Sequence, residues 1–352
     1  MPLTSEKIHR HRRLFLATAV ASVGQFSRPG IASPVPTDTS SGLPLAARLA
    51  NLERDASRLD RLRALVVMHE GEIVLADTFS GPSVDSAVNV KSVSKSINAA
   101  LMGCAIKRGV VRDVSMTLNE CIPHLIPDEA DPRVRSITLG NLLSMQAGLQ
   151  RTSGPFYGPW VASDNWVNYV LSRPFVAEPG GRMLYSTGDW HVLGAALSAL
   201  SGASLLDMTR DWLGNPLKIE FAPWTRDPQG RYMGGNEMYL SPLHMAKIGE
   251  LYRLNGQWNK QAVFDKDWVQ QSFTARTFSP YSGDDYGYGW FLRNVGKSGF
   301  SYARGYGGQF IHVLPSEALV VVMTSDWRRS ARGGIYTEQL HNLVTDHLIS
   351  DA

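Results

Sequence analysis

The sequence predicts a protein of the α/β (α+β) class, in which a mainly antiparallel sheet carries helices on both faces and a helical lobe stands beside it. Strand patterns occur near both ends of the chain, over residues 62–79 and 286–324, separated by short turns. Between them, residues 110–225 read mostly as short helices broken by Pro and Gly. Because short turns join antiparallel neighbours, both ends should contribute to one sheet and the middle should form an inserted lobe.

The individual elements follow from local patterns, taken in chain order. Two apolar runs flank a His-Glu-Gly turn and predict a hairpin over residues 62–79. A run of small and apolar residues after position 92 predicts a buried helix that ends at Gly109. The remaining expected elements are helices over 138–145 and 189–200, strands over 286–292, 309–314 and 318–324, and a closing helix over 335–349.

Composition narrows the classes of function. The chain has 352 residues, 43% hydrophobic and 19% charged, as in globular proteins of one large domain or two lobes. Its net charge of +3 is small, and its basic residues are scattered beyond the N-terminus, without the footprint of a nucleic-acid-binding protein. Cys104 and Cys121 have no metal-binding spacing; Cys104 is expected to pack as a small hydrophobe, and a disulfide between the two requires export. We expect no metal and no cofactor.

Residues 1–42 predict an export signal followed by a linker, ahead of a folded domain over 43–352. Basic residues at 9–13 precede an apolar run over 14–23. Within this segment Arg12-Arg13 resembles a twin-arginine signal, which carries folded proteins to a periplasmic or secreted location. The apolar run is too short to span a bilayer, so no stable membrane insertion is expected. A disordered basic tail and a misplaced start codon are the alternatives.

The most informative local pattern is Ser92-Val-Ser-Lys95, at the head of the long apolar helix. Residues three apart share a helix face, so the Ser92 hydroxyl and the Lys95 amine should meet one turn apart. A serine becomes a nucleophile when a neighbouring base takes its proton, and a lysine buried in an apolar wall loses its charge near neutral pH. Alternatively, Ser92 is a plain helix N-cap and Lys95 a snorkelling surface residue.

Two further segments carry candidate site residues. Tyr185 leads a loop into the next long helix, where a tyrosine can share a proton with Lys95 or pass one to a leaving group. A half-buried core tyrosine is the alternative. The glycine-rich run 305–308 stands just before a strand, where glycines let a backbone approach a ligand closely. The backbone N–H groups of Ser92 and Tyr306 are therefore a candidate oxyanion hole, with a plain hairpin turn as the alternative.

Together these segments resemble the serine β-lactamase and penicillin-binding-like superfamily, and within it the class C-like branch of esterases and 6-aminohexanoate-dimer (nylon-oligomer) hydrolases. The resemblance rests on an ordered set of motifs that spans about residues 60 to 350, and no single motif decides it. It implies a β-lactamase/transpeptidase-like fold. The matching stretches are 90–96, 137–148, 179–194, 234–236, 286–290 and 303–309.

The resemblance implies that Ser92 is the acylated nucleophile, Lys95 its general base and Tyr185 the third member of the set. The family's Tyr-x-Asn element reads Tyr185-Ser-Thr187 here, so a hydroxyl replaces the amide that contacts the substrate amide in the lactamases. The family's Lys-Thr-Gly strand motif becomes Ala303-Arg304-Gly305. The lysine that meets a β-lactam carboxylate is missing, and Arg304 replaces it only if its side chain faces the site. Both departures argue against penicillin-type chemistry.

Two literal motifs suggest a different assignment. Ser163-Asp164-Asn165 and Lys297-Ser298-Gly299, together with the Ser92 motif, spell the class A lactamase set in the right order. The first lies in an aromatic loop over 156–166, and the second in a polar turn several residues before the strand edge. We interpret both as coincidences, an interpretation that Lys297 in the cleft beside Ser92 would overturn.

The expected function is that of a serine hydrolase that cleaves a small ester or amide through an acyl-enzyme, without a cofactor. The absence of a Gly-x-Ser-x-Gly elbow argues against an α/β-hydrolase. The alternatives are a β-lactamase or D-Ala-D-Ala carboxypeptidase acting on a lactam or peptide, and a non-catalytic penicillin-binding-like module. Expected substrate-binding residues are Thr187 and Gly305, with an acyl pocket lined by Phe156, Tyr157, Trp160, Trp166 and Trp190.

Overall fold

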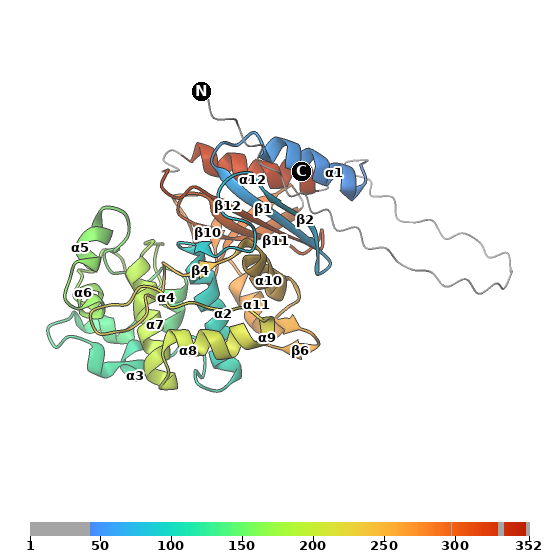
Figure 1. The fold of residues 1–352 in the computed structure, drawn as a ribbon. Coiled ribbons are helices and arrows are strands. Elements are labelled where there is room, and N and C mark those ends of the chain that lie inside the picture. The colour runs from blue at the N-terminus through green and yellow to red at the C-terminus, as the bar shows by residue number, and fades with distance from the viewer. Residues whose placement is uncertain (1–42, 297, 330–333, 350–352) are drawn as a thin grey trace, which may run out of the picture.

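The computed structural model describes residues 43–296, 298–329 and 334–349 (Figure 1). The expected export signal and linker, residues 1–42, lie outside the described residues. The rest of the chain forms a large antiparallel sheet with helices on both faces and a helical lobe beside it, so the expected fold class is confirmed (Figure 1).

An eight-stranded antiparallel sheet is the centre of the fold. The last strand of the sequence lies in its middle, because β12 pairs with β1 on one side and with β11 on the other. Both ends of the chain therefore build one sheet, as the sequence predicts. The strand order is β2 (Glu72–Thr78), β1 (Leu62–His69), β12 (Leu319–Ser325), β11 (Gln309–Leu314), β10 (Ser298–Gly305), β9 (Phe291–Val295), β8 (Asp285–Tyr286) and β7 (Thr277–Phe278). Two short ladders stand apart, β3 (Val88–Asn89) with β4 (Tyr239–Leu240) and β5 (Gln257–Trp258) with β6 (Gln261–Ala262).

Helices cover both faces of the sheet (Figure 1). Every residue of β11 and β12 is buried, which is why these strands read as continuous apolar runs rather than alternating ones. On one face α12 (Ile335–Leu348) packs with α1 (Leu45–Ala56), and on the other α10 (Pro242–Arg253) packs on β1, β11 and β12. The helix α11 (Lys266–Ser272) lies near α10 and α2 in Figure 1.

The expected strand over 286–292 is interrupted, which corrects the prediction. Tyr286 pairs directly with Phe291, so residues 287–290 form a turn between β8 and β9. The turn leaves the ladder because Gly289 has a φ of +80°, and because its carbonyl oxygen accepts a 2.6 Å hydrogen bond from Ser96 Oγ. The turn therefore packs on the helix that carries Ser92.

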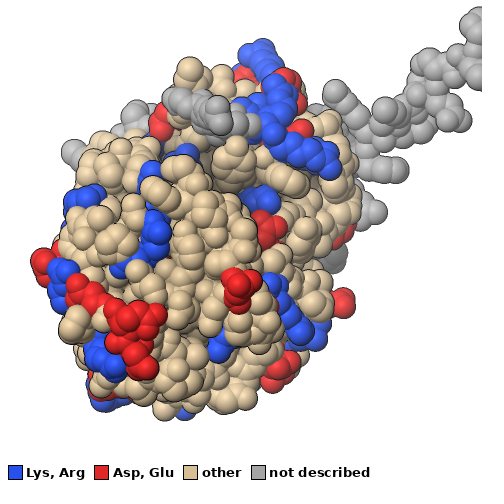
Figure 2. All heavy atoms as spheres, turned by 90° about the vertical axis from the view of Figure 1, so that its left-hand side faces the viewer, with Lys and Arg blue, Asp and Glu red and all other residues tan. Residues whose placement is uncertain are grey.

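The helical lobe occupies the middle of the sequence and the left of Figure 1. Its longest helix, α7, is buried over its first three turns, and α3, α4 and α6 pack around it. Figure 2, which views the molecule from that side, shows acidic and basic side chains interspersed on a mostly uncharged surface. The helices are α3 (Leu118–Cys121), α4 (Leu139–Leu143), α5 (Tyr157–Val161), α6 (Trp166–Leu171), α7 (Thr187–Ser201), α8 (Leu205–Thr209) and α9 (Asn215–Leu217).

No single helix of the described chain is long and apolar enough to cross a membrane; the bent pair Thr187–Ser201 and Leu205–Leu217 passes only when its two helices are counted together.

The helix α2 (Val93–Lys107) joins the lobe to the sheet. It is buried from Val93 to Ala105 and packs on β10, β11 and α7. It ends as the sequence predicts, with Gly109 in the left-handed region at a φ of +69°. Cys104 within it and Cys121 in α3 are both buried and free, so the disulfide that export would permit is absent between them.

Candidate active site

A cavity of about 700 Å³ opens where the N-terminus of α2, the end of β10 and the helical lobe meet. Ser92 reaches it from α2, Tyr185 and Thr187 from the start of α7, and Gly305 and Tyr306 from the end of β10. The motifs singled out in the sequence therefore meet at one place in the fold.

Ser92 and Lys95 lie one helical turn apart, as their spacing predicts. Ser92 is the residue before α2, and its side chain caps no backbone N–H of that helix. Lys95 is almost fully buried, and its Nζ lies 3.0 Å from Ser92 Oγ. The plain N-cap and surface-lysine alternatives therefore do not describe these two residues.

Lys95 has two more partners in its buried site. Its Nζ contacts the Gly235 carbonyl oxygen at 2.6 Å and Thr187 Oγ1 at 3.3 Å. Burial lowers the pKa of Lys95 to about 7, an effect that the charge of Asp189 partly opposes. Near neutral pH a large share of Lys95 is thus the free amine, which donates to Gly235 and Thr187 and accepts from the Ser92 hydroxyl.

Tyr185 stands beside Lys95, with its ring centre 5.1 Å from Lys95 Nζ. Burial raises the pKa of Tyr185, while a hydrogen bond with Ser92 and the positive charge of Arg304 oppose the rise. The phenol therefore keeps its proton at neutral pH. Of the two groups that contact Ser92, Lys95 is the one able to take its proton, and Tyr185 is the one able to donate.

The start of α7 holds this arrangement in place. Thr187 N–H donates to Ser153 Oγ at 2.9 Å, and Thr187 Oγ1 lies 2.9 Å from the same atom. Ser186 caps the helix by accepting from the N–H of Asp189. Asp189 is buried near Lys95, and burial raises its pKa to about 7. Neither Ser153 nor Asp189 was assigned a role from the sequence: Ser153 belongs to no recognisable motif, and Asp189 lies in the matching stretch 179–194 without a role of its own.

The Ser92 and Tyr306 N–H groups lie on two segments that touch backbone to backbone. A Cβ at Gly305 would lie only 2.3 Å from the Val90 carbonyl oxygen, so only glycine allows this approach. In the described part of the chain, no backbone carbonyl accepts a hydrogen bond from either N–H. Both donors are available to a substrate oxyanion.

The expected pocket aromatics fall into two groups. Tyr157 lines the cavity, and its hydroxyl accepts a 3.2 Å hydrogen bond from Asn236 Nδ2. The other four do not line it, and Trp160 and Trp190 are fully buried, so the expected acyl pocket is not formed by Phe156, Trp160, Trp166 and Trp190. Trp160 packs edge-on against Tyr157, with 5.6 Å between ring centres, and supports the cavity wall from behind.

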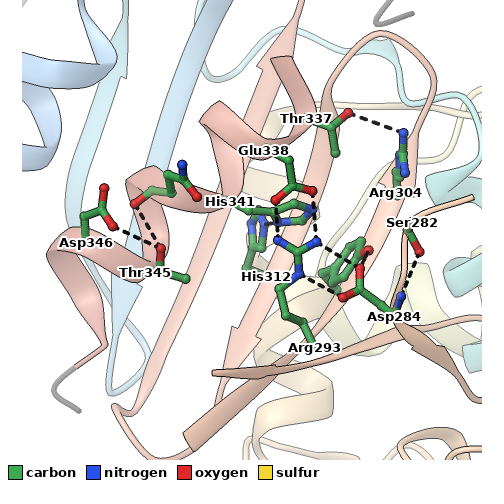
Figure 3. A network of polar contacts seen from close by, with 12 residues as sticks. Ser282, Asp284, Arg293, Arg304, His312, Thr337, Glu338, His341, Thr345 and Asp346 are labelled. Carbon is green, nitrogen blue, oxygen red and sulfur yellow. Dashed lines mark hydrogen bonds and ion pairs between the residues drawn. The ribbon is translucent and has the colours of Figure 1, made fainter. Parts of the chain in front are cut away.

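Arg304 lines the cavity, so it meets the condition for replacing the missing lysine of the family's strand motif. Its Nη2 donates to Thr337 Oγ1 at 3.3 Å. Figure 3 shows the polar network behind it, in which Arg293 holds Asp284 and Glu338 through hydrogen bonds of 2.9 to 3.1 Å. Because Asp284 closes the loop that brings Ser279 and Tyr281 to the cavity, this network stiffens one wall of the site.

Arg151 and Asn236 line the cavity, but neither was assigned a role from the sequence. Arg151 contacts the Tyr281 hydroxyl at 2.8 Å. Neither Arg151 nor Arg304 forms an ion pair with a carboxylate of the described residues, whereas Glu237 in the same wall is paired with Lys91. Together with a hydrogen bond from Arg293, the charge of Arg304 helps to lower the pKa of Glu338, but no carboxylate in that part of the chain is bound directly to Arg151 or Arg304. The cavity wall therefore carries two arginines without a directly paired carboxylate. Asn236 Oδ1 is buried and has no hydrogen-bond partner within the same ranges.

The described residues of the two literal lactamase motifs do not line this cavity. Ser163 donates to the Trp160 carbonyl oxygen and Asn165 caps α6, and neither lines the site. Ser298 and Gly299 begin β10, whereas the end of that strand reaches the cavity. Lys297 itself lies outside the described residues. Within them, no group of three or more His, Cys, Asp or Glu side chains is arranged to hold a metal ion.

The chain also matches a known protein family. A family model described as Beta-lactamase matches residues 60–345. The chain belongs to the beta-lactamase family. The match covers the whole eight-stranded sheet and the whole helical lobe, and so includes every segment that lines the cavity. No curated protein matches the chain.

Solved structures of this family share the fold at low sequence identity. One is a putative 6-aminohexanoate-dimer hydrolase from Bacillus anthracis, with a TM-score of 0.69 and 17% identity over 91% of this chain and 88% of that one. A second is EstCE1, a hydrolase with promiscuous acyltransferase activity, with a TM-score of 0.69 and 19% identity over 85% and 98%. A third is an octameric penicillin-binding protein homologue from Pyrococcus abyssi, with a TM-score of 0.65 and 16% identity over 87% and 79%.

Proposed function

We propose that this member of the beta-lactamase family is a serine hydrolase that cleaves an ester or amide bond through an acyl-enzyme on Ser92. One observation carries the proposal. The Lys95 amine lies 3.0 Å from Ser92 Oγ in a site whose burial lowers the lysine pKa to about 7. A base whose pKa lies near the working pH is the most effective at activating a hydroxyl.

In the proposed mechanism, Lys95 takes the Ser92 proton as Oγ attacks the substrate carbonyl carbon. The N–H groups of Ser92 and Tyr306 bind the negative oxygen of the tetrahedral intermediate. Protonated Tyr185 then supplies a proton to the leaving alcohol or amine, and the proton on Lys95 restores that of Tyr185. Water, deprotonated along the same route in reverse, attacks the ester on Ser92 and releases the acid.

The polar groups of the cavity suggest the kind of substrate. Arg151 and Arg304 form no direct ion pair with a carboxylate in the described chain, so a substrate with a negatively charged group gains from both. Asn236 lines the cavity, and its side-chain amide is able to pair with the N–H of an amide substrate. Thr187 in place of the lactamase asparagine argues for an ester or open amide rather than a β-lactam. The names of two structural neighbours, an aminohexanoate-dimer hydrolase and the hydrolase EstCE1, point the same way.

The proposal is tested with p-nitrophenyl esters of short and medium acids, comparing the wild type with Ser92→Ala. We expect a burst of p-nitrophenol and an acyl adduct on the Ser92 peptide by mass spectrometry, both absent from Ser92→Ala. Rapid turnover of a chromogenic cephalosporin with little ester cleavage would instead favour the lactamase alternative. A folded wild type with neither adduct nor turnover would favour a binding module.

A further inference from the structure

A lysine in the left-handed backbone region stands immediately before the proposed nucleophile. Lys91 has a φ of +52°, which is unfavourable for a residue with a Cβ. Its neighbours hold it there. Its N–H donates to Asn89 Oδ1 at 2.9 Å, and its carbonyl oxygen accepts from Ser94 Oγ at 2.6 Å. Strained backbone that its surroundings hold in place is typical of functional sites.

The Lys91 side chain bridges two other segments of the cavity wall. Its Nζ lies 3.0 Å from Glu237 Oε1 and 4.0 Å from the centre of the Trp327 ring. Glu237 is held in turn by Asn89 Nδ2 at 2.6 Å. Lys91 is 12% and Glu237 21% exposed, so water screens these contacts less than it would on the open surface.

Trp327 contacts the loop that carries Tyr306, the second residue of the proposed oxyanion hole. A Cβ at Gly307 would lie 2.4 Å from Trp327 Cα, so the loop after β10 rests directly on the Trp327 backbone. The same loop touches Val90 through Gly305, at 2.3 Å for the equivalent Cβ. The segment before Ser92, the loop after β10 and Trp327 therefore form a closed ring of contacts. The Lys91 side chain joins the segment before Ser92 to Trp327.

We propose that Lys91 is a positioning residue, which through Trp327 and Glu237 fixes the separation of the Ser92 and Tyr306 N–H groups. The proposal rests on the hydrolase function proposed above. Lys91 itself moves no proton in this scheme. Loss of its side chain frees the loop after β10 to move relative to α2, while the Ser92–Lys95 pair stays intact because Ser92 occupies the N-cap position of α2 and Lys95 lies in its first turn.

This division of roles predicts a specific kinetic signature. The rate of acylation falls, because the oxyanion loses well-placed donors. The KM for a neutral ester changes little, because such an ester has no charged group to pair with the Lys91 ammonium. The pH midpoint of acylation also stays in place, because the surroundings of Lys95 are unchanged.

The test uses full-length Lys91→Met and Trp327→Leu, with Trp327→Phe as the conservative variant that keeps a ring for the cation. Lys107→Met is the matched control, because Lys107 lies at the other end of α2 and pairs with Asp265 at 3.2 Å. Readouts are the labelling rate of Ser92 by a fluorophosphonate probe, the burst and KM with a neutral p-nitrophenyl ester, the pH profile and the melting temperature.

We expect Lys91→Met and Trp327→Leu to lower the labelling and burst rates about 10- to 100-fold. Trp327→Phe should stay within about 3-fold of wild type because it preserves the cation–π contact, and Lys107→Met should match wild type. The double variant Lys91→Met/Trp327→Leu should be no slower than the worse single one, since both remove the same link.

Three results would overturn the positioning role. The first is a wild-type rate in Lys91→Met. The second is an effect confined to KM, which would make Lys91 a substrate-binding cation. The third is a shifted pH midpoint, which would mean that the charge of Lys91 acts on Lys95. Labelling of wild-type Ser92 leaves the hydrolase proposal standing in each of these cases. Failure of the wild type to label would overturn the proposed function and the positioning role together.

Discussion

Replacing Gly305 with alanine should disable the proposed oxyanion hole while leaving Ser92, Lys95 and Tyr185 untouched. The new Cβ would lie 2.3 Å from the Val90 carbonyl oxygen, whereas ordinary contact begins at 3.4 Å. The two segments must therefore separate by about 1.1 Å, and no rotamer change relieves the clash because the contacted atom is backbone. A hydrogen bond from the adjacent Tyr306 N–H does not survive a displacement of that size.

Loss of one oxyanion donor lowers an acylation rate about 10² to 10³-fold, equivalent to about 2.7 to 4 kcal/mol of transition-state stabilisation. The burst phase with a p-nitrophenyl ester measures it directly. Gly299→Ala is the matched control, because Gly299 lies in the same strand as Gly305 but at the end away from the cavity. Its new Cβ would lie 2.7 Å from the Arg293 carbonyl oxygen of the neighbouring strand β9. A full burst rate in folded Gly305→Ala, or an equal loss in Gly299→Ala, would refute the reasoning.

Four further outcomes are expected. The acylation rate rises with pH through about 7, because it follows the free amine of Lys95, and a flat profile across that range would contradict this role. An ester with a carboxylate is cleaved faster than its neutral analogue, and Arg304→Gln reduces that preference about 10-fold; equal ratios in both proteins would count against the cationic cavity. Asn236→Leu slows anilide cleavage more than ester cleavage, because only the anilide has an N–H for the side-chain amide of Asn236, and parallel losses would argue otherwise. The melting temperature falls as pH drops below about 6.5. Burial lowers the pKa of His312 to about 3 and that of His341 well below its usual value, so the unfolded chain binds more protons than the folded one in this range. A constant melting temperature down to pH 4 would contradict this.

The parts of the structure that were predicted correctly depend on short-range patterns. The helix from Val93 to Lys107 and its glycine stop follow from a run of small apolar residues and a left-handed cap. Ser92 and Lys95 meet because one helix carries both, so their contact needs no knowledge of the rest of the fold. The burial that lowers the Lys95 pKa was inferred from the same apolar run.

The errors and omissions concern contacts between distant segments. Trp160 and Trp190 were placed in the pocket because they are aromatic residues near Gly and Pro, but burial in a helical lobe depends on which neighbours pack over them. Ser153 belongs to the site only because the fold brings it into contact with Thr187. In the same way, the fold brings Asn236 into contact with Tyr157. No local pattern marks such residues, because a single serine or asparagine in a loop has many uses.

The pairing of β1 with β12 affects how the chain is made. The sheet cannot close until residues 319–325 have left the ribosome, although β1 and β2 emerge near the beginning. During that interval the hairpin exposes an apolar strand edge that is open to wrong partners. Contacts between such distant segments also slow folding. The newly made chain should therefore depend on chaperones, and stalled or truncated products should aggregate rather than fold in part.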